Sequence, residues 1–456
     1  MDFVPSFTTP VYEDKRSLMG LMRSNTGLPT PPPNGNLEKA DEYFFDVPII
    51  EVTPPPRESR SIVAVIGVGY IGYQLATAFG RVHDVIAFDV DQRRLSEIEP
   101  LMANLKVHCT TNPEELAIAT HFLISVPTRL HHDNTVDTQH LRSAIDLVAQ
   151  YARPGSTVVI ESSVAVGMSR DLLKEVMLLK GLKAGMSPER VDPGRTDPPL
   201  EHIPKIISGL DDIVPGSLSS IQELYEQVFR NLVPVSSPEV AEMTKLYENC
   251  QRMVCIAHAN EMADACHTLG INPHEVSAAA ASKPFGYMPY SPGLGVGGHC
   301  IPVNPYYLLS NCDFPLLKAA SEKMANRPAT LGDRVMRRYL NRRKASWTGP
   351  PKSDRTRVLV VGVGFKRGQS VLSNSPGLAL TRHLLDEWEA YVEFADPLVS
   401  EEAVPYVPRL DDQKDWNKES LEEQFDIIIV AVNQVGLDMD VLRNLDGVHV
   451  ENFTAS

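Results

Sequence analysis

The sequence predicts an α/β protein in which two doubly wound, Rossmann-like domains are joined by a central helical domain with one long helix. A strand–glycine–helix–strand pattern begins at Ser61, and a second set of apolar strands begins near residue 357. Between them, a helical pattern runs for about 32 residues, or roughly 48 Å at 1.5 Å per residue. A chain of 456 residues exceeds one ordinary core. We therefore expect a Pro-rich disordered tail (1–60), a dinucleotide-binding domain (61–234), the helical domain (235–336), a linker (337–356) and a second Rossmann-like domain (357–456).

Composition narrows the classes of partner. With 43% hydrophobic and 22% charged residues, most of the chain should be globular. The formal charge of -15 disfavours nucleic acid and anionic membranes, although it permits a small anionic ligand held by local backbone amides and a few basic side chains. The six cysteines lack C-x-x-C spacing, so we expect neither a metal site nor a disulfide framework. Together with the absence of an N-terminal apolar segment or of a run of about 18 apolar residues, this predicts a cytoplasmic protein that does not enter membranes.

The first 60 residues are rich in proline and polar residues, most plainly at Pro29–Pro33 and Pro54–Pro56. This composition is typical of a disordered or loosely docked tail. An apolar patch at Tyr43–Phe45 precedes Val47–Ile50. It either docks on the folded body, binds a partner, or is a stray apolar cluster.

A dinucleotide site is predicted at the start of the first folded domain, just after the predicted tail. The apolar strand Ile62–Ile66 leads into Gly67, Gly69 and Gly72, a helical pattern follows, and the next strand ends at Asp89, about 20 residues past the first glycine. The glycines permit a tight turn, close approach of a pyrophosphate to a helix N-terminus, and packing of that helix on the strand. An acid at the second strand end accepts from ribose hydroxyls and repels a 2′-phosphate, which predicts NAD as cofactor. The expected cofactor-binding residues are Gly67, Gly69, Tyr70, Ile71, Gly72, Asp89 and Arg94.

Two further strand ends carry polar residues. One strand, His121–Val126, ends just before Thr128, and another, Thr157–Ile160, ends at Glu161. Ligands meet the carboxyl ends of strands in an open parallel sheet, so both side chains are candidates for the cofactor site and for catalysis. The alternative is that each simply caps the next turn or helix. Polar loops at Ser187–Gly194 and at Lys205 should edge the same cleft, and spacing alone gives them no role.

The long helix should begin after the N-cap Ser237 and end near Gly270. A helix of this length usually links two domains or supplies a dimer interface. Lys245, Asn249 and Arg252 lie at i, i+4 and i+7 on one face. Such a face is most often solvated, but if it is directed into a cleft, Lys245 and Asn249 would form a pair of donors for an oxyanion. The predicted apolar stripe comprises Val240, Met243, Leu246, Tyr247, Cys250, Met253, Val254 and Ala257.

A glycine-rich stretch precedes Cys300. Four of the six residues 293–298 are glycine, which lets the backbone approach a ligand closely and present a reactive thiol. The alternative is a surface turn beside a buried cysteine that acts as a small hydrophobe. Further along, the strand Val358–Val361 also ends in glycines, but without the full dinucleotide pattern, so this last domain should hold a different nucleotide.

These motifs together resemble the UDP-glucose/GDP-mannose dehydrogenase family from about Ser61 to Glu451. Arg252 and Asn260–Glu261 resemble the branch that oxidises UDP-N-acetylmannosamine or UDP-N-acetylglucosamine at C6. The motifs that carry the resemblance are Gly67–Gly72, Ser187–Arg190 with Pro193–Gly194, Glu242 through Lys245 to Glu248–Asn249, Pro292–Gly293 through Cys300–Pro302, and Phe365–Lys366 through Ser375–Pro376.

The resemblance implies a four-electron oxidation of a UDP-sugar C6 alcohol to the acid, with two NAD consumed. Cys300 would attack the C6 aldehyde as a thiolate, which a nearby lysine favours, and water would hydrolyse the resulting thioester. Lys245 and Asn249 would stabilise the C6 oxyanion, while Thr128 and Glu161 would relay water and protons. At least a homodimer is also implied. The implied substrate site comprises Glu189, Arg190, Lys245, Asn249, Arg252, Tyr290, Gly293, Gly297 and Lys366.

The chain departs from the family pattern at three places. Asn304 stands four residues after the cysteine, where the family usually has an aspartate, and it cannot take up a proton. Val371–Asn374, with Ser373 in place of the arginine, replaces a charged Asp-x-Arg element, and Asn433 replaces a histidine. Asn304 would slow thioester hydrolysis or proton uptake. The alternatives are therefore a catalytically impaired NAD- and nucleotide-sugar-binding protein, a UDP-glucose 6-dehydrogenase, or a two-electron dehydrogenase on the same scaffold.

Overall fold

The computed structural model describes residues 50–51, 61–192, 194–195, 197–346 and 355–454. The chain divides into the units Met1–Val47 and Pro48–Ser456, and all described residues lie in the second. Most of the expected tail, including Tyr43–Phe45, therefore lies outside the described residues. The tail prediction is wrong at its end, because strand β1 (Ile50–Glu51) pairs antiparallel with β11 (Asn231–Pro234). Two residues assigned to the tail thus extend the first sheet.

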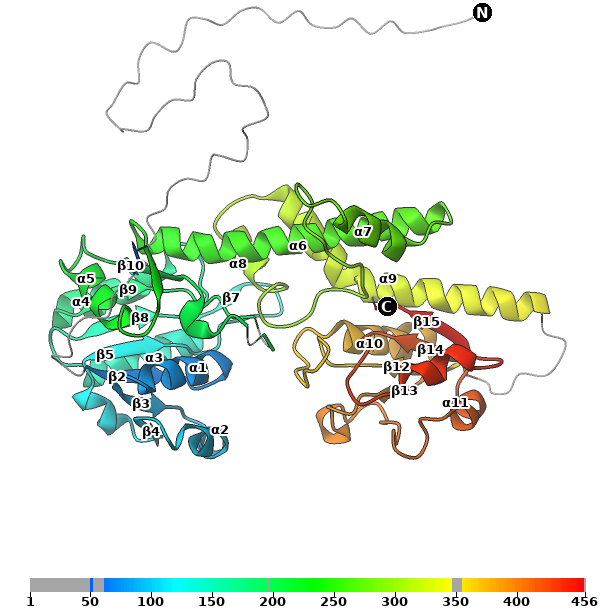
Figure 1. Cartoon of the computed structure of the whole chain (residues 1–456), viewed down its shortest axis with the longest axis horizontal. Coiled ribbons are helices and arrows are strands. Elements are labelled where there is room, and N and C mark those ends of the chain that lie inside the picture. The colour runs from blue at the N-terminus through cyan, green and yellow to red at the C-terminus, as the bar shows by residue number, and fades with distance from the viewer. Residues whose placement is uncertain (1–49, 52–60, 193, 196, 347–354, 455–456) are drawn as a thin grey trace, which may run out of the picture. The chain divides into compact units, whose positions relative to one another are not determined.

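The first domain is built on a nine-stranded sheet in the order β1-β11-β10-β9-β8-β5-β2-β3-β4 (Figure 1). From β4 to β9 the strands are parallel, in the order of a dinucleotide-binding fold whose topology reverses between β2 and β5. The strand β10 is antiparallel to β9. The strands not yet bounded are β2 (Ile62–Ile66), β3 (Asp84–Phe88), β4 (Val107–Thr110), β5 (His121–Ile124), β8 (Thr157–Ile160), β9 (Lys183–Met186) and β10 (Lys205–Gly209), with a separate hairpin of β6 (Arg129–Leu130) and β7 (Val136–Asp137).

Alternation along β2 explains the two helical layers on this sheet. Val63 and Val65 join one buried cluster, whereas Ala64 and Ile66 join the other, because successive strand residues point to opposite faces. One cluster contains residues of α1 (Tyr70–Gly80), α2 (Gln92–Ile98) and α5 (Ser217–Tyr225), and the other contains residues of α3 (Gln139–Tyr151) and α4 (Met168–Lys180). Short 3-10 turns complete the domain at Glu99–Met102, Pro113–Ile118 and Leu200–His202.

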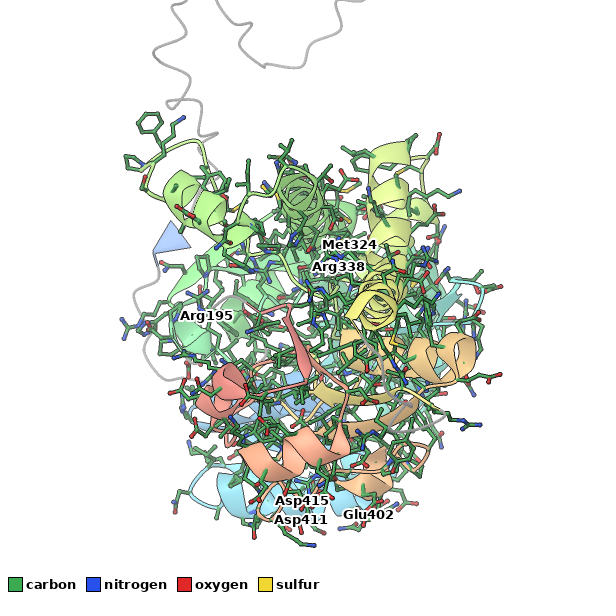
Figure 2. The ribbon with its side chains drawn as sticks, turned by 90° about the vertical axis from the view of Figure 1, so that its right-hand side faces the viewer. Arg195, Met324, Arg338, Glu402, Asp411 and Asp415 are labelled. Atoms are coloured by element: carbon green, nitrogen blue, oxygen red, sulfur yellow. The ribbon has the colours of Figure 1, made fainter. Side chains whose placement is uncertain are left out.

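The central region contains two long helices, α6 (Pro238–Thr268) and α9 (Pro315–Ser346), with the shorter α7 (Pro273–Ala281) and α8 (Asn304–Leu309) between them. The predicted long helix is confirmed as α6, whereas α9 was not predicted. The linker expected from residue 337 is wrong, because that segment is helical as far as Ser346. The α9 helix continues past Pro328 to Ser346 because its last turns pack on the final domain: Val335 and Met336 are buried, and Arg338 faces Glu451 at 3.6 Å. Figure 2 marks Met324 and Arg338 on this helix. The basic residues that resembled a linker are the outer face of a helix.

The predicted limits of α6 are close to the observed ones, but its predicted apolar stripe is partly wrong. Leu246, Cys250, Met253 and Ala257 are buried, whereas Val240, Met243 and Tyr247 are exposed, Tyr247 at 68%. The buried face includes Glu242, Lys245 and Asn249 instead. Polar residues occupy this face because it borders the candidate active site, so apolar periodicity alone placed the stripe incorrectly.

The last domain is a four-stranded parallel sheet in the order β13-β12-β14-β15. Its strands are β12 (Arg357–Val361), β13 (Tyr391–Ala395), β14 (Ile427–Val430) and β15 (His449–Asn452), with helices α10 (Pro376–Trp388) and α11 (Lys418–Gln424) and 3-10 turns at Glu401–Ala403 and Met439–Asn444. Ser375 caps α10, because its hydroxyl accepts from the Leu378 amide at 3.2 Å. The predicted second Rossmann-like domain is confirmed. Acidic side chains of this domain, among them Glu402, Asp411 and Asp415, lie together at its edge (Figure 2).

Candidate active site

The glycine turn after β2 has room for a dinucleotide only because its glycines lack side chains. Gly67 has φ +87°, and a Cβ on Gly72 would lie 1.9 Å from the Gly67 carbonyl oxygen. A Cβ on Gly69 would meet nothing within 4 Å, so the space in front of α1 is open. No side chain caps the N-terminus of α1, which leaves its first amide groups available. These features fit a pyrophosphate bound at a helix N-terminus.

Side chains from the next strand and helix hold this turn in place. One Asp89 oxygen accepts from the Val68 amide at 2.7 Å and the other accepts from the Asp91 amide at 3.0 Å. Arg94 donates to the carbonyls of Val68 and Gly69 at 3.0 and 3.4 Å. Tyr70 is exposed and its hydroxyl accepts from the Gly194 amide, while Ile71 packs against the core. The predicted cofactor residues therefore gather around one open turn.

The two predicted residues at further strand ends differ in their surroundings. Thr128 is half-buried and donates to the Ser163 carbonyl at 2.9 Å. Glu161 is fully buried; one of its oxygens accepts from Lys205 at 2.6 Å and the other from the Tyr225 hydroxyl. Both oxygens of the Glu161 carboxylate thus face protein partners. A proton that reaches this carboxylate would come through Lys205 or Tyr225.

Charge in the Glu161 network is balanced by one lysine. Lys205 Nζ also lies 3.4 Å from a Glu189 oxygen, so one ammonium faces two carboxylates. Desolvation raises the pKa of Glu161, although Lys205 opposes this. Burial alone would lower the pKa of Lys205, but Glu161 and Glu189 outweigh it and the pKa is raised. The lysine therefore stays protonated, and it anchors three segments of the first domain to one another.

Lys245, Asn249, Asn304 and Cys300 form the centre of the candidate site. Lys245 and Asn249 are each 7% exposed and lie one turn apart on α6. Asn249 Nδ2 donates to Asn304 Oδ1 at 2.5 Å. The backbone N–H of Asn304 donates to the backbone carbonyl of Cys300 at 2.9 Å. Burial lowers the pKa of Lys245, while Cys300 is close enough to raise it in opposition. A half-buried thiol thus lies next to a desolvated lysine and a pair of amides.

Arg252, by contrast, is exposed. Seven residues keep it on the same side of the helix as Lys245 but place it about 10 Å further along the axis. It is therefore not brought together with Lys245 and Asn249.

Glu189 and Arg190 already have protein partners. Glu189 accepts from the amides of Arg190 and Val191, and the Arg190 guanidinium pairs with Glu248 at 2.5 Å. These contacts fix the 187–191 loop against α6. Tyr290 is half-buried and its hydroxyl contacts Met288 at 3.8 Å. In this structure, these three predicted substrate-binding residues serve to hold their own loops.

The segment that departs from the family pattern packs directly on the cysteine loop. The Gly298 amide donates to the Ser373 carbonyl at 2.8 Å, and Asn374 Nδ2 donates to the Gly298 carbonyl at 2.9 Å. The Ser373 hydroxyl also lies 3.0 Å from His299 Nε2. A Cβ on Gly297 would lie 2.9 Å from Phe365 Cβ. The last domain therefore holds the cysteine loop through neutral contacts.

A cavity of about 450 Å³, called here the loop cavity, lies between the glycine stretch and the ends of β12 and β14. Lys366 lines it and also faces Asp192 at 3.3 Å, so the lysine connects the last domain to the 187–194 loop. The loop cavity is lined by Ser291, Gly293, Leu294, Gly295, Phe365, Lys366, Arg367, Pro376, Gly377, Ala431, Val432, Asn433, Phe453 and Thr454.

Several residues of this region were missed by the sequence analysis. Tyr225 and Arg367 carry no motif signal, and Phe453 lies beyond the last recognised strand. Asn260 was noted only as part of a motif, yet its Oδ1 accepts from the Gly293 amide at 2.9 Å. Arg327 donates to the Gly293 carbonyl at 3.0 Å. The two contacts fix the first glycine of the loop from opposite sides.

The fold and the open glycine turn define an NAD-binding oxidoreductase with a second Rossmann-like domain. Among the described residues there is no cluster of acidic, histidine or cysteine side chains able to hold a metal, and none of the described helices is long and apolar enough to span a membrane. Residues 61–229 match the UDP-glucose/GDP-mannose dehydrogenase family, NAD binding domain, and residues 239–323 match the central domain of that family. The chain belongs to the UDP-glucose/GDP-mannose dehydrogenase family.

Known relatives agree with this assignment. The chain is 32% identical to a UDP-N-acetyl-D-glucosamine 6-dehydrogenase of Pseudomonas aeruginosa over 369 residues, covering 75% of this chain and 83% of that protein. It is 31% identical to a UDP-N-acetyl-D-mannosamine dehydrogenase of Pyrococcus horikoshii, covering 69% and 79%. The solved structure of a UDP-D-ManNAc dehydrogenase from Pyrococcus horikoshii superposes with a TM-score of 0.73 at 26% identity, covering 86% of this chain and 99% of that one.

Proposed function

We propose that this protein oxidises the C6 alcohol of a UDP-sugar, preferably a UDP-N-acetylhexosamine, to the uronic acid in an NAD-dependent four-electron reaction. The observation that carries the proposal is the position of Cys300 beside the buried Lys245 and the Asn249–Asn304 pair. The names of the related proteins support the substrate class. NAD held at the Gly67–Gly72 turn would accept hydride.

In the proposed reaction, the chain's own groups handle the sugar end. Lys245 and Asn249 donate to the C6 oxygen as it gains negative charge. The C6 alcohol would first lose its proton and pass a hydride to one NAD, which yields the C6 aldehyde. The Cys300 thiolate would then attack the aldehyde, and the resulting thiohemiacetal would pass a second hydride to a second NAD to give a thioester. Water then releases the acid and returns the thiol. The loop cavity would hold the UDP, with Lys366 and Arg367 near its phosphates.

Replacement of the thiol separates this proposal from a two-electron oxidation. In Cys300→Ser, acid formation should fall by at least about 10³-fold, because the covalent route is lost. Mass spectrometry of the product would show the uronic acid with the wild type and not with the variant. Unchanged acid production by Cys300→Ser, with the same NAD affinity, would rule out the thioester route.

Asn304 supports a second candidate function, namely an impaired enzyme that binds NAD and a UDP-sugar without full turnover. Its side chain is 2% exposed and its oxygen is occupied by Asn249, so it offers no base for the hydrolysis step. Calorimetry would then detect binding of both ligands while no uronic acid appears. The two candidates therefore share binding and differ in product.

We further propose that the protein self-associates in the cytoplasm. Val240, Met243 and Tyr247 form an exposed apolar strip on α6, and such a strip favours burial against another chain. Sedimentation or light scattering should show at least a dimer. Tyr247→Glu should shift the association equilibrium toward the monomer. A monomer at all concentrations would contradict this assignment.

A further inference from the structure

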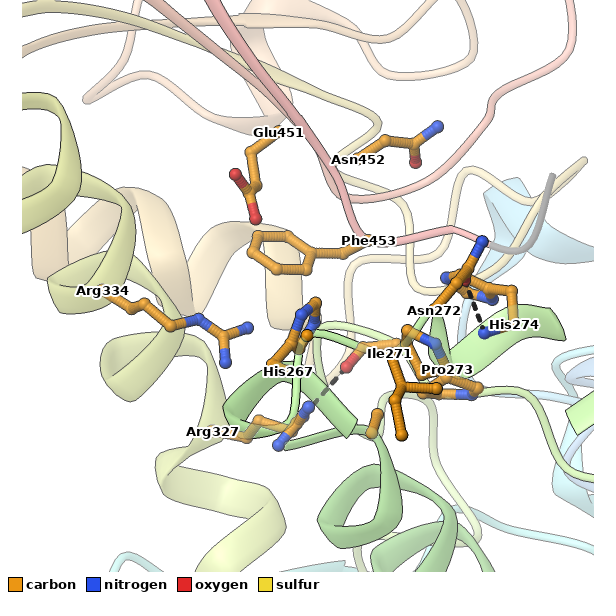
Figure 3. A pocket seen from close by; sticks show the side chains of 14 residues that line it. His267, Ile271, Asn272, Pro273, His274, Arg327, Arg334, Glu451, Asn452 and Phe453 are labelled. Carbon is orange, nitrogen blue, oxygen red and sulfur yellow. Dashed lines mark hydrogen bonds between the residues drawn. The ribbon is translucent and has the colours of Figure 1, made fainter. Parts of the chain in front are cut away.

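A second cavity, of about 440 Å³, shares the lining residues Gly293 and Phe453 with the loop cavity, and Figure 3 shows its lining side chains. It is called here the arginine cavity. The end of α6, the start of α7, the first residues of the glycine stretch, α9 and the end of β15 form its walls. Its volume lies within the range of small-molecule sites, roughly 300–1,000 Å³. Its polar and aromatic lining residues are His267, Asn272, His274, Arg327, Arg334, Glu451, Asn452 and Phe453.

Two arginines dominate the polar wall of this cavity, Arg327, which is buried, and Arg334, which is 24% exposed. Arg327 is 6% exposed and pairs with Asp264 at 2.7 Å. Arg334 shares the same carboxylate at 3.2 Å, and its Nε is buried while no described residue accepts a hydrogen bond from it. One carboxylate therefore serves two guanidinium groups. Burying an excess of positive charge is costly unless an anion completes the site.

The other carboxylate at the cavity, Glu451, does not supply the missing acceptor. It lies 3.6 Å from Arg338 and 3.5 Å from His449, and both groups lower its pKa, His449 more than Arg338. Around the cavity, three arginines thus face two carboxylates. His267 adds no fixed charge, because burial and the neighbouring Arg334 and Arg338 lower its pKa. The balance favours a bound anion that carries phosphate or carboxylate oxygens.

The opposite wall is apolar and aromatic. Phe453, Ile271 and Pro273 line it, and Figure 3 shows the Phe453 ring among the labelled side chains. Asn452 is exposed, so its amide is available to a ligand. Figure 3 also places the Glu451 carboxylate close to the Phe453 ring, where it could accept from hydroxyl groups. A flat ring, hydrogen-bonding groups and paired guanidiniums match the parts of a nucleoside phosphate.

We propose that the arginine cavity binds a nucleoside phosphate, with its phosphate at Arg327 and Arg334 and its base against Phe453, and that the bound ligand steadies the glycine loop. The connection to the loop is direct, because Arg327 Nε donates to the Gly293 carbonyl. Gly293 lines both cavities. A ligand that fixes Arg327 therefore also fixes the start of the loop that leads to Cys300. This site is separate from the reaction proposed at Cys300 and does not depend on it.

Titration calorimetry with UMP, in the presence of saturating NAD, tests the proposal. We expect a binding component that weakens at least about tenfold in Arg334→Gln and in Arg327→Lys. It should persist in Arg337→Gln, a matched change of an exposed arginine on the same helix that pairs with Asp333 outside the cavity. It should also persist in Lys366→Ala, because Lys366 lines the loop cavity and is not among the residues that line the arginine cavity. Arg327→Lys keeps the positive charge. If this variant melts at the same temperature as the wild type, its loss of UMP binding does not come from unfolding.

The same samples give a second readout. Hydrogen exchange of the peptide spanning residues 291–300 should slow when UMP binds to the wild type or to Arg337→Gln, and should not slow in Arg334→Gln. The proposal is overturned if UMP binding is absent, if it is lost only in Lys366→Ala, or if it survives Arg334→Gln unchanged. Inorganic phosphate that binds as tightly as UMP would overturn the nucleoside assignment, because Phe453 would then contribute nothing.

Discussion

Asn304→Asp should convert a slow hydrolysis step into a faster one. The Asn304 side chain is 2% exposed and is hydrogen-bonded to Asn249, one helical turn from Lys245. A carboxylate at this position would keep the contact with Asn249, and its negative charge would raise the pKa of Lys245, against the lowering that burial causes.

The new carboxylate would also act as a base for the attacking water. General-base catalysis typically contributes about 10²–10⁴-fold, so steady-state turnover should rise by about 10²-fold. Stopped-flow measurement of NADH with UDP-N-acetylmannosamine separates the steps. The wild type should show a burst of NADH followed by slow turnover, and the variant should keep the burst and lose the slow phase.

Asn304→Ala is the matched control for this variant. It removes the partner of Asn249 without adding a base, so its turnover should not exceed that of the wild type. The reasoning is refuted if Asn304→Asp melts like the wild type and yet shows no gain in steady-state rate. It is equally refuted if the wild type shows no burst, because hydrolysis would then not limit turnover.

Three further predictions follow from the packing and charges of the first domain. Lys205→Met leaves two buried carboxylates without their cation, so the free energy of unfolding measured in urea should fall by about 3–5 kcal/mol; a loss below about 1 kcal/mol would contradict the ion network. Gly72→Ala should lower the melting temperature, because its Cβ would lie 1.9 Å from a carbonyl oxygen, whereas Gly69→Ala should leave melting unchanged and weaken only NAD binding. Burial lowers the pKa of His121 to about 4, so the folded state binds fewer protons than the unfolded state between pH 6.5 and 4. Acidification through this window should cost up to about 3 kcal/mol of stability, and His121→Asn should flatten that dependence; an unchanged slope would show that other groups cause it.

The first sheet was predictable because local signals and global packing agree. The apolar run Ile62–Ile66, the three glycines and Asp89 each predict the same strand and turn, and the structure forms them. The same agreement holds for β12 and β14, whose valine and isoleucine runs are buried on both faces of a parallel sheet.

The central region was predicted less well because its packing partners are distant in sequence. Periodicity placed Tyr247 in the core, where the structure places Lys245 and Asn249. Contacts with segments distant in sequence determine which face of α6 is buried, among them the contact of Asn249 with Asn304, 55 residues further on, and that of Glu242 with the amides of Gly167 and Ser169. The C-terminal end of α9 was predicted as a linker for a similar reason. Its basic residues have the composition of a linker, and its buried residues pack against the last domain, which follows later in the sequence.

The candidate site was predictable as a set of residues but not as a set of contacts. Sequence reasoning selected Glu161 and Glu189 as working groups, and the structure shows both engaged by Lys205. Arg327 and Phe453 gave no signal at all, because their importance comes from the cavities they line.

Incubation of the purified full-length chain with NAD and a panel of UDP-sugars, analysed by mass spectrometry, tests the central claim most directly. We predict a UDP-uronic acid, most abundant from a UDP-N-acetylhexosamine, with two NADH formed for each sugar oxidised. Formation of NADH without acid would indicate a two-electron dehydrogenase. The absence of NADH and of acid with every UDP-hexose and UDP-N-acetylhexosamine tested would contradict the account.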